Sequence, residues 1–267
     1  MVPTIVPVIV ILAWWLVTKA GIISGTFLPT PGKVGSALLD WTTGIAPGAT
    51  GENQGGGASV YNGYWLRDAW ASGFRVLLGF SVGSALGLII GTLLGYFPLF
   101  RRAVEPLIHM LRAIPIIGWL PLSLVFFGFG LKSAVFLVAL GCFFPVVVNT
   151  MSGVQGVSLS SLRVGSMMGA SRSQQLRFII VPSAMPSIIT GLRVAMGFAW
   201  ILVIVAEWLA VRSGLGYTLL DAYRFVRYDY VIAAMISIGA VGFLSDKLLY
   251  RVSLRTVRWH TETTLGT

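Results

Sequence analysis

Apolar residues along this chain form six long runs that polar stretches separate. The runs cover roughly residues 4–23, 75–97, 107–128, 131–150, 187–210 and 229–250. A helix needs about 20 apolar residues to cross the hydrocarbon core of a bilayer, and each run meets or approaches that length. The pattern predicts an all-α integral membrane protein with about six transmembrane helices, organised as a single transmembrane domain over residues 1–267.

Prolines interrupt the third and fourth runs. Pro115, Pro121 and Pro145 each remove one helical N–H donor, and only residues 128–130 separate the two runs. Both helices are therefore expected to be kinked, and one of them to be shorter than a full span.

Basic residues indicate how the helices are oriented. If the loop after the fourth run is cytoplasmic, the short loops on that side hold most of the arginines, as the positive-inside rule requires. The residues concerned are Arg101, Arg102, Arg112, Arg163, Arg172, Arg177, Lys247, Arg251, Arg255 and Arg258. Both termini are predicted to be cytoplasmic. The long outer loop after the first run contains seven glycines between residues 44 and 63, which favours a flexible insertion over a binding element.

The composition agrees with a chain that lipid surrounds. Hydrophobic residues make up 56% and charged residues 10%, whereas a soluble domain has about 25% charged residues. The net charge of +10 comes from basic residues scattered singly between apolar runs, so no nucleic-acid partner is predicted. One cysteine, Cys142, and two histidines are too few for a usual zinc site, and we expect no metal or cofactor on this chain.

Five glycines in the second run lie four residues apart. They are Gly79, Gly83, Gly87, Gly91 and Gly95. Four residues turn a helix through about 400°, so these glycines form a nearly continuous strip on one face. The strip predicts that another membrane helix packs closely against this one.

Two polar positions within the runs are candidates for chemistry. Gly79-Phe80-Ser81-Val82-Gly83 matches the G-x-S-x-G pattern of serine hydrolases, but that motif needs a strand-to-helix turn, and Ser81 lies in a helical run. An intramembrane serine hydrolase that uses Ser81 is therefore an unfavoured alternative. Glu207 is expected to be the one acid inside a span, with Arg75 as its ion-pair partner; a structural pair is favoured over a group in a pathway.

The loop between the fourth and fifth runs, residues 155–187, is polar, basic and long. Gly169 to Arg172 can end one short helix and begin another, with Ser171 as the N-cap. Pro182 and Pro186 then close the loop before the next membrane helix. The pattern predicts a structured cytoplasmic loop that docks a partner.

The spacing of Gly169, Ile179, Val181 and Pro182 resembles the EAA loop of ABC-importer permeases, whose pattern is E-A-A-x3-G-x9-I-x-L-P. Further segments are similar to the nitrate, sulfonate, taurine and bicarbonate branch of that family: Leu28-Pro29-Thr30-Pro31, Pro186-Ser187-Ile188-Ile189-Thr190-Gly191-Leu192-Arg193, Ala206-Glu207 and Gly214-Leu215-Gly216. The resemblance runs from about residue 28 to Trp259. The chain departs from the pattern where Arg163, Val164 and Gly165 replace the acid and two alanines, and where Val181 replaces leucine.

The resemblance implies the type I ABC-importer permease fold, with a coupling helix that contacts a cytoplasmic ATPase. The residues at that contact would be Arg163, Ser166, Gly169, Ala170, Ser171, Arg172 and Pro182. It also implies an ATPase dimer, a second permease copy, and a periplasmic or lipid-anchored substrate-binding protein, in a bacterial inner membrane. The chain has no G-x4-G-K-[ST] phosphate loop, so it is not expected to be an enzyme, and ATP and Mg²⁺ are expected on the ATPase.

In such a permease, the translocation path would run along the second to fifth spans. The candidates in this sequence are Trp119, Ser123, Asn149, Arg193 and Glu207. Arg112 and Arg193, near the inner mouth, would favour a small anion such as nitrate, sulfonate, taurine or bicarbonate. An ion-coupled secondary transporter is the alternative from another class, and it predicts inverted repeats and several intramembrane acids, which we do not find.

Overall fold

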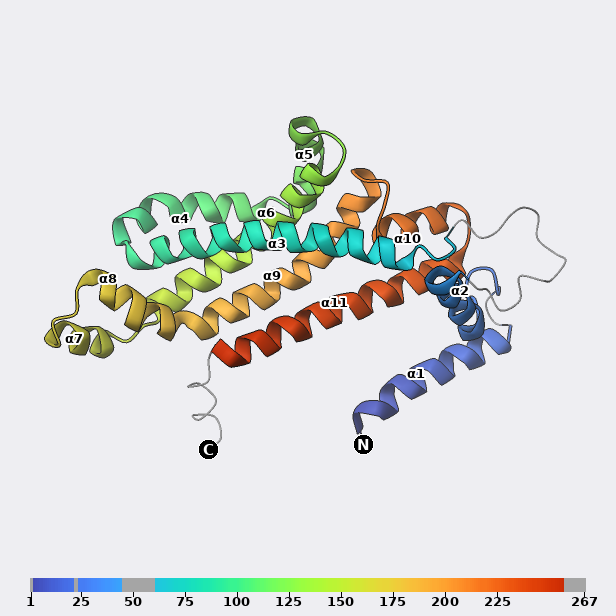
Figure 1. Cartoon of the computed structure of the whole chain (residues 1–267), viewed down its shortest axis with the longest axis horizontal. Helices are drawn as coiled ribbons and strands as arrows, with labels where there is room; N and C mark the ends of the chain where they lie inside the picture. The colour runs from blue at the N-terminus through green and yellow to red at the C-terminus, as the bar shows by residue number, and fades with distance from the viewer. Residues whose placement is uncertain (1, 22–23, 45–60, 257–267) are drawn as a thin grey trace. The chain divides into compact units, whose positions relative to one another are not determined.

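The computed structural model describes residues 2–21, 24–44 and 61–256, and every regular element within these ranges is helical (Figure 1). The elements are α1 (Val2–Lys19), α2 (Pro31–Thr43), α3 (Trp65–Tyr96), α4 (Pro98–Ala113), η1 (Ile116–Trp119), α5 (Leu120–Phe127), α6 (Leu131–Gln155), α7 (Leu159–Met167), α8 (Arg172–Gln175), η2 (Leu176–Ile180), α9 (Val181–Leu209), α10 (Leu215–Arg224) and α11 (Tyr228–Thr256). The predicted all-α class is confirmed. Of the glycine-rich outer loop, residues 45–60 lie outside the described residues.

Four helices in the described ranges are long and apolar enough to cross a membrane. They are Trp65–Tyr96, Leu131–Gln155, Arg172–Leu209 and Tyr228–Ser253. The bent pair Pro98–Ala113 and Ile116–Phe127 makes a fifth span if it is counted as one. In the first predicted run lies α1, of which Val8–Lys19 is a shorter apolar helix. Within the described residues, four or five of the expected six spans are therefore present by length and composition.

The third run is the one that the sequence placed least accurately. It is not one helix over 107–128, because α4 ends at Ala113 and the chain bends by 91° before Ile116–Phe127. Ile114 is extended, with φ −72° and ψ 122°, as expected for a residue that precedes a proline. Pro115 therefore ends the helix instead of only kinking it.

The fifth membrane helix begins well before residue 187. The helix runs without a break from Arg172 to Leu209, so the expectation that Pro182 and Pro186 close the loop before this helix is wrong. Pro182 lies in the first turn of α9, directly after the π-helical turn η2, and Pro186 lies inside α9. A proline in a first turn costs little, because that N–H has no partner within the helix.

The chain divides into two compact units, one of residues 1–73 with 211–241 and the other of residues 74–210 with 242–267. In the first unit, helix α2 is capped at both ends: Thr30 accepts a hydrogen bond from the Lys33 N–H, and Gly44 adopts a left-handed φ of +71°. Its buried Asp40 accepts a hydrogen bond from the Tyr230 hydroxyl at the start of α11. This bond joins segments that lie far apart in the sequence.

A second hydrogen bond in this unit joins the segment before α3 to α10. The Tyr61 hydroxyl donates to the Asp221 carboxylate at 2.7 Å. Burial, together with this hydrogen bond, raises the pKa of Tyr61 above its usual value. Tyr61 therefore stays neutral and remains a donor throughout the physiological pH range.

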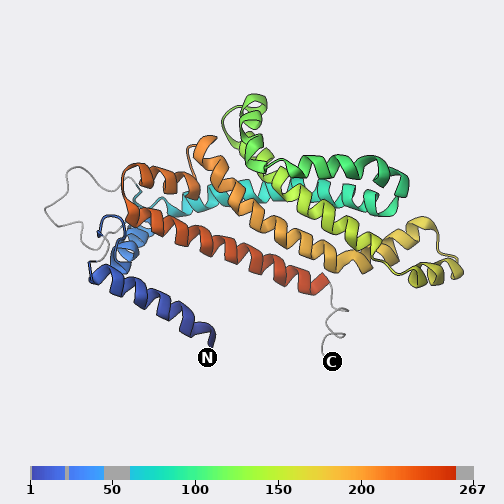
Figure 2. The same ribbon diagram turned by 180° about the vertical axis from the view of Figure 1, so that it is seen from behind.

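In the second unit, the glycine strip of α3 lies against α6. A Cβ added at Gly79 would come within 2.6 Å of Val138, and one at Gly91 within 2.7 Å of Thr150. At Gly83 the added atom would overlap the Ala139 backbone itself. Helix α6 also packs along α9, and α3, α6 and α9 run side by side in both views (Figures 1 and 2). Glycine is what lets α3 approach α6 so closely.

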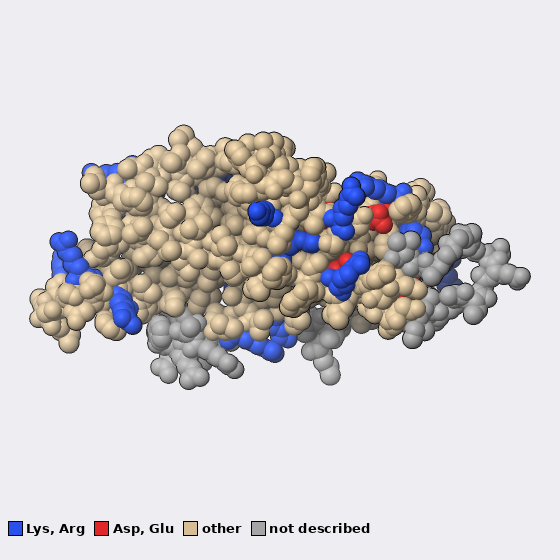
Figure 3. Space-filling model, turned by 45° about the horizontal axis from the view of Figure 1, so that its top comes forward, with Lys and Arg blue, Asp and Glu red and all other residues tan. Residues whose placement is uncertain are grey.

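The face of α3 away from the strip carries large apolar side chains that are exposed. Leu77, Leu86 and Ile89 are 60%, 50% and 58% exposed. On the molecular face drawn in Figure 3, most of the surface is uncharged, and the charged side chains gather in a few groups. Exposed leucine and isoleucine over a helical span match a helix that lipid surrounds.

Candidate functional site

Between α7 and α8 the chain makes a tight turn, in which the C-terminus of α7 and the N-terminus of α8 are both capped. Gly169 adopts φ +76°, its N–H donates to the Ser166 carbonyl, and the Ala170 N–H donates to the Gly165 carbonyl, both at 3.0 Å. These two bonds constitute a Schellman motif, which satisfies the last carbonyls of α7. The expected end of one helix at this glycine is confirmed.

The next helix begins with a capping box at Ser171. The Gln174 N–H donates to the Ser171 hydroxyl at 3.4 Å, and the Ser171 N–H donates to the Gln174 side-chain oxygen at 2.8 Å. Gln175 then bridges the turn, because its amide donates to the Ser166 hydroxyl at 3.1 Å and to the Ala170 carbonyl at 3.2 Å. Ser171 is therefore the N-cap that the sequence predicted.

The turn presents its side chains outward. Met167 and Met168 are 86% and 82% exposed. Among the expected coupling residues, Arg163, Ser166, Gly169, Ser171 and Arg172 are exposed, whereas Ala170 and Pro182 are half-buried. We define residues 163–175, where the resemblance places the ATPase contact, as the coupling segment. It combines a turn that is capped on both sides with an exposed apolar tip, which the sequence analysis did not single out.

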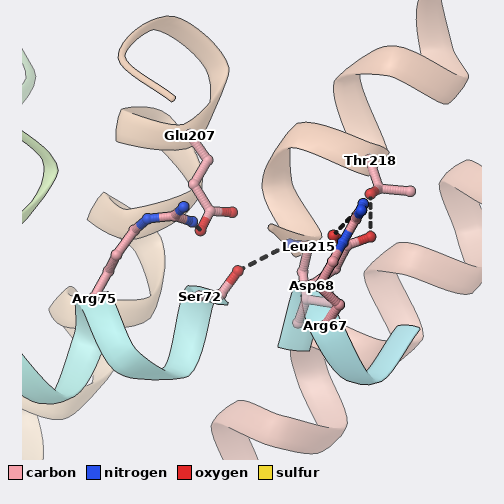
Figure 4. Close-up of polar contacts among 7 residues, drawn as sticks. All are labelled: Arg67, Asp68, Ser72, Arg75, Glu207, Leu215 and Thr218. Carbon is pink, nitrogen blue, oxygen red and sulfur yellow. Dashed lines mark hydrogen bonds and ion pairs between the residues drawn. The ribbon is translucent and has the colours of Figure 1, made fainter. Parts of the chain in front are cut away.

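Arg75 on α3 and Glu207 on α9 form a buried ion pair, in which an Arg75 guanidinium N–H donates to a Glu207 carboxylate oxygen at 2.5 Å (Figure 4). Their side chains are 7% and 0% exposed. The structure thus brings together the two residues that the sequence paired. The burial of Glu207 fits a link between helices better than a group that touches a solute.

One turn before Arg75, Ser72 supports the start of α10. The Leu215 N–H donates to the Ser72 hydroxyl at 2.9 Å, and Thr218 donates to the buried Asp68 carboxylate at 3.0 Å (Figure 4). Leu215 is the first residue of α10, so its N–H has no acceptor inside that helix. The Ser72 hydroxyl thus supplies an acceptor for the first N–H of α10, and Asp68 adds a side-chain bond to the same helix.

Replacing Ser72 with alanine is expected to lower stability by about 1–3 kcal/mol, because the buried Leu215 N–H would lose its acceptor. The measurement is the thermal unfolding midpoint of the purified protein in detergent. Ser36→Ala is the matched control, since Ser36 is half-buried on α2 and donates to the Lys33 carbonyl of its own helix. Equal midpoints for the two variants would contradict the capping role.

The five candidates for the translocation path differ in their surroundings and in their hydrogen bonds. Asn149 lines a cavity of about 430 Å³, and its amide donates to the Pro145 carbonyl at 2.8 Å. Ser123 is buried and donates to the Leu120 carbonyl at 2.7 Å. Trp119 is half-buried at the end of η1.

Arg193 has an acidic partner that the sequence analysis missed. Its guanidinium makes two hydrogen bonds to the Asp246 carboxylate, at 3.1 and 2.9 Å. Asp246 lies within α11, so the expectation that Glu207 is the only acid inside a span is wrong. The signal was present, because Asp246 interrupts the sixth apolar run; its pairing across 53 residues is what no local pattern shows.

The serine hydrolase alternative finds no support in the structure. Ser81 lies in the middle of α3 and not at a strand-to-helix turn, which the nucleophile elbow requires. His109 is on α4, where it lies 3.7 Å from Glu105 of the same helix. The G-x-S-x-G match belongs to the glycine strip.

Comparisons with known proteins agree with the sequence resemblance. The model of the family of binding-protein-dependent transport system inner membrane components matches residues 83–258. The taurine transport system permease protein TauC of Escherichia coli K12 is 32% identical over 95% of this chain and 88% of its own length. The nitrate import permease protein NrtB of Synechocystis is 31% identical over 91% of this chain and 85% of its own length.

A solved structure supports the fold. A chain of the MetNI methionine ABC transporter, in an inward-facing conformation, aligns with a TM-score of 0.58 and 20% identity, over 73% of this chain and 94% of its own. These matches support the importer interpretation and neither the secondary transporter nor the hydrolase. In ABC importers the ATPase is a separate subunit, so this chain is not an enzyme. It belongs to the binding-protein-dependent transport system inner membrane components, as a multi-pass permease subunit of an ABC importer.

Proposed function

We propose that this chain carries a small oxyanion across the membrane, and that its coupling segment receives the motion of a cytoplasmic ATPase dimer that holds ATP and Mg²⁺. Two copies of the chain would form the path, a periplasmic or lipid-anchored binding protein would deliver the solute, and both termini would be cytoplasmic in a bacterial inner membrane. The observation that carries the coupling role is the doubly capped turn at Gly169 with its exposed Met167 and Met168.

The helix that follows the turn connects it directly to the membrane-spanning region. The helix from Arg172 to Leu209 has no break, and α9 packs along α6. Because the Schellman motif and the capping box leave the turn few alternative conformations, a displacement of the turn moves α9 as a lever. Coupling then requires two arrangements of the membrane helices, one favoured by nucleotide and the other by its absence.

Two substitutions at the exposed tip test this role without disturbing the caps. Met167→Gln with Met168→Gln is expected to weaken co-purification of the ATPase at least about tenfold, because two apolar side chains would lose their burial in the complex. Leu159→Gln is the matched control, as Leu159 is 69% exposed at the other end of α7. Pull-down of the ATPase and ATP-dependent uptake into proteoliposomes are the measurements.

Deletion of residues 166–174 is the stronger version of this test. It removes the Gly169 turn and most of α8, and it is expected to abolish association with the ATPase or to uncouple hydrolysis from uptake. If association and ATP-dependent uptake both survive the deletion, the coupling assignment is wrong.

The oxyanion class rests on the relatives. TauC is described for taurine, which carries a sulfonate group, and NrtB for nitrate. Thermal-shift measurements on the binding protein encoded with this chain, against nitrate, sulfonates, taurine and bicarbonate, test the class. Stabilisation by none of these oxyanions would contradict it.

A further inference from the structure

The second unit contains a cavity of about 430 Å³ where α4 ends, bounded by α6 and α9. Its volume lies in the usual range of small-molecule sites, roughly 300–1,000 Å³. Most of its lining is apolar, from residues such as Ile114, Pro115 and Phe144. Two lining residues have polar side chains, Arg112 and Asn149.

The cavity lies at the bend between α4 and the helix Ile116–Phe127, which make one broken span if they are counted together. The extended backbone at Ile114 and Pro115 separates two helices that differ in direction by 91°. Backbone outside a helix is tolerated at membrane depth only where protein covers it or where it lines a polar space. Many secondary transporters, a different class, form their solute sites at discontinuous helices of this kind. The break therefore marks a place where a polar solute can lie inside the membrane region.

The charge at this place is positive. No ion pair joins Arg112 to an acid among residues 2–21, 24–44 and 61–256, and no acid lines the cavity. Arg193 and Arg75 differ in this respect, because Asp246 and Glu207 balance their charges. Of the two arginines that the sequence associated with an anion, only Arg112 has a charge that no acid in the described chain balances.

Asn149 of α6, the second polar residue of the lining, is held in place. Its amide has two N–H donors, one of which bonds the Pro145 carbonyl at 2.8 Å. Gly191 of α9 lies directly behind it, since a Cβ there would come within 2.7 Å of the Asn149 Cβ. The Asn149 side chain is thus held by its bond to α6 and by the close approach of α9, and the second N–H has no acceptor among the described residues.

We propose that this cavity is the transit site for the oxyanion group of the transported solute. Arg112 supplies the compensating charge and a fork of N–H donors that matches the oxygens of a sulfonate, nitrate or bicarbonate, and Asn149 supplies a neutral N–H donor. The apolar walls receive whatever uncharged part the solute carries. This inference rests on the proposed import of an oxyanion and assigns the place where that oxyanion binds within the chain.

The test is uptake by the intact complex of permease, ATPase and binding protein in proteoliposomes, with labelled taurine and nitrate as the probes. Arg112→Gln and Asn149→Asp are each expected to lower kcat/KM for uptake about ten- to a hundredfold, the loss that a charge-assisted hydrogen bond represents. Arg112→Lys should retain more uptake than Arg112→Gln, because it keeps the charge. Arg101→Gln is the control, since Arg101 lies on α4 near Glu105 and does not line the cavity.

The outcomes separate the two hypotheses. Failure of the wild-type complex to transport any oxyanion contradicts the proposed function and this inference together. Wild-type uptake that both variants retain overturns the transit site alone. Loss of uptake with a matching loss of thermal stability, which Arg112→Lys does not relieve, also overturns it, because Arg112 would then act only in folding.

A labelling experiment reads the charge of the cavity without transport. Cys142 is the only cysteine of this chain and is buried, so Asn149→Cys in a Cys142→Ala background gives each copy of the chain one thiol, whose labelling is read on the separated permease band. The quantity measured is the labelling rate of a sulfonate-bearing methanethiosulfonate divided by the rate of its trimethylammonium counterpart. We expect this ratio to be higher for the thiol at position 149 than for a free thiol in solution, and Arg112→Gln to lower it by about tenfold. A ratio that Arg112→Gln leaves unchanged would overturn the assignment of Arg112.

Discussion

Replacing Arg75 or Glu207 singly with alanine is expected to destabilise the protein by about 3–5 kcal/mol, because each change leaves an uncompensated charge in a buried place. Their side chains are 7% and 0% exposed, and they lie 2.5 Å apart. The measurement is the thermal unfolding midpoint together with the yield of monodisperse protein in detergent. Arg101→Ala is the control, because the pair of Arg101 with Glu105 lies at 3.9 Å and both side chains are about one-third exposed; a surface pair contributes only about 0–1 kcal/mol.

The exchanged pair, Arg75→Glu with Glu207→Arg, is expected to recover part of the loss. A double-mutant cycle measures the coupling, and additive losses would contradict the pairing. The apolar pair Arg75→Met with Glu207→Met separates structure from transport, since replacing both charges of a buried pair is often neutral for stability. A stable Met–Met variant that retains uptake makes the pair a structural link, whereas a stable variant without uptake places Glu207 in the pathway.

Local features of the structure were accessible from the sequence. The glycine strip was visible because a four-residue spacing maps directly onto one helix face, and the Gly169–Ser171 turn because caps require particular residue types at adjacent positions. The extent of the helices was less accessible. An apolar run indicates only the part of a helix that lies in lipid. Helix α3 begins ten residues before its apolar run, because Asp68 and Ser72 in that polar part form hydrogen bonds with α10.

Pairings between distant segments were mostly out of reach. Asp40 and Tyr230 lie 190 residues apart, and Tyr61 and Asp221 lie 160 apart. Nothing in either local sequence specifies its partner, because the contact exists only once the chain has folded. Arg75 and Glu207 were the exception. An acid near the end of an apolar run is costly enough to demand a basic partner at the same depth, and few basic residues met that condition.

Helix α3 offers a sharp test of close packing, because two of its glycines have opposite surroundings. Gly83→Ala is expected to cost about 1–3 kcal/mol or more, since the new Cβ would overlap backbone atoms of Ala139. No neighbouring side chain can turn aside to relieve that overlap, so α3 and α6 must move apart. Their separation would disturb the contacts that Gly79 and Gly91 make along the same strip.

Gly73→Ala is the internal control, because a Cβ there meets nothing within 4 Å. It should leave stability unchanged or raise it by about 0.5–1 kcal/mol, as alanine is the better helix former. Unfolding midpoints of both variants in the same detergent decide the comparison. A Gly83→Ala midpoint at or above that of Gly73→Ala would contradict the close packing of α3 on α6. The glycine strip would then not be what holds these two helices together.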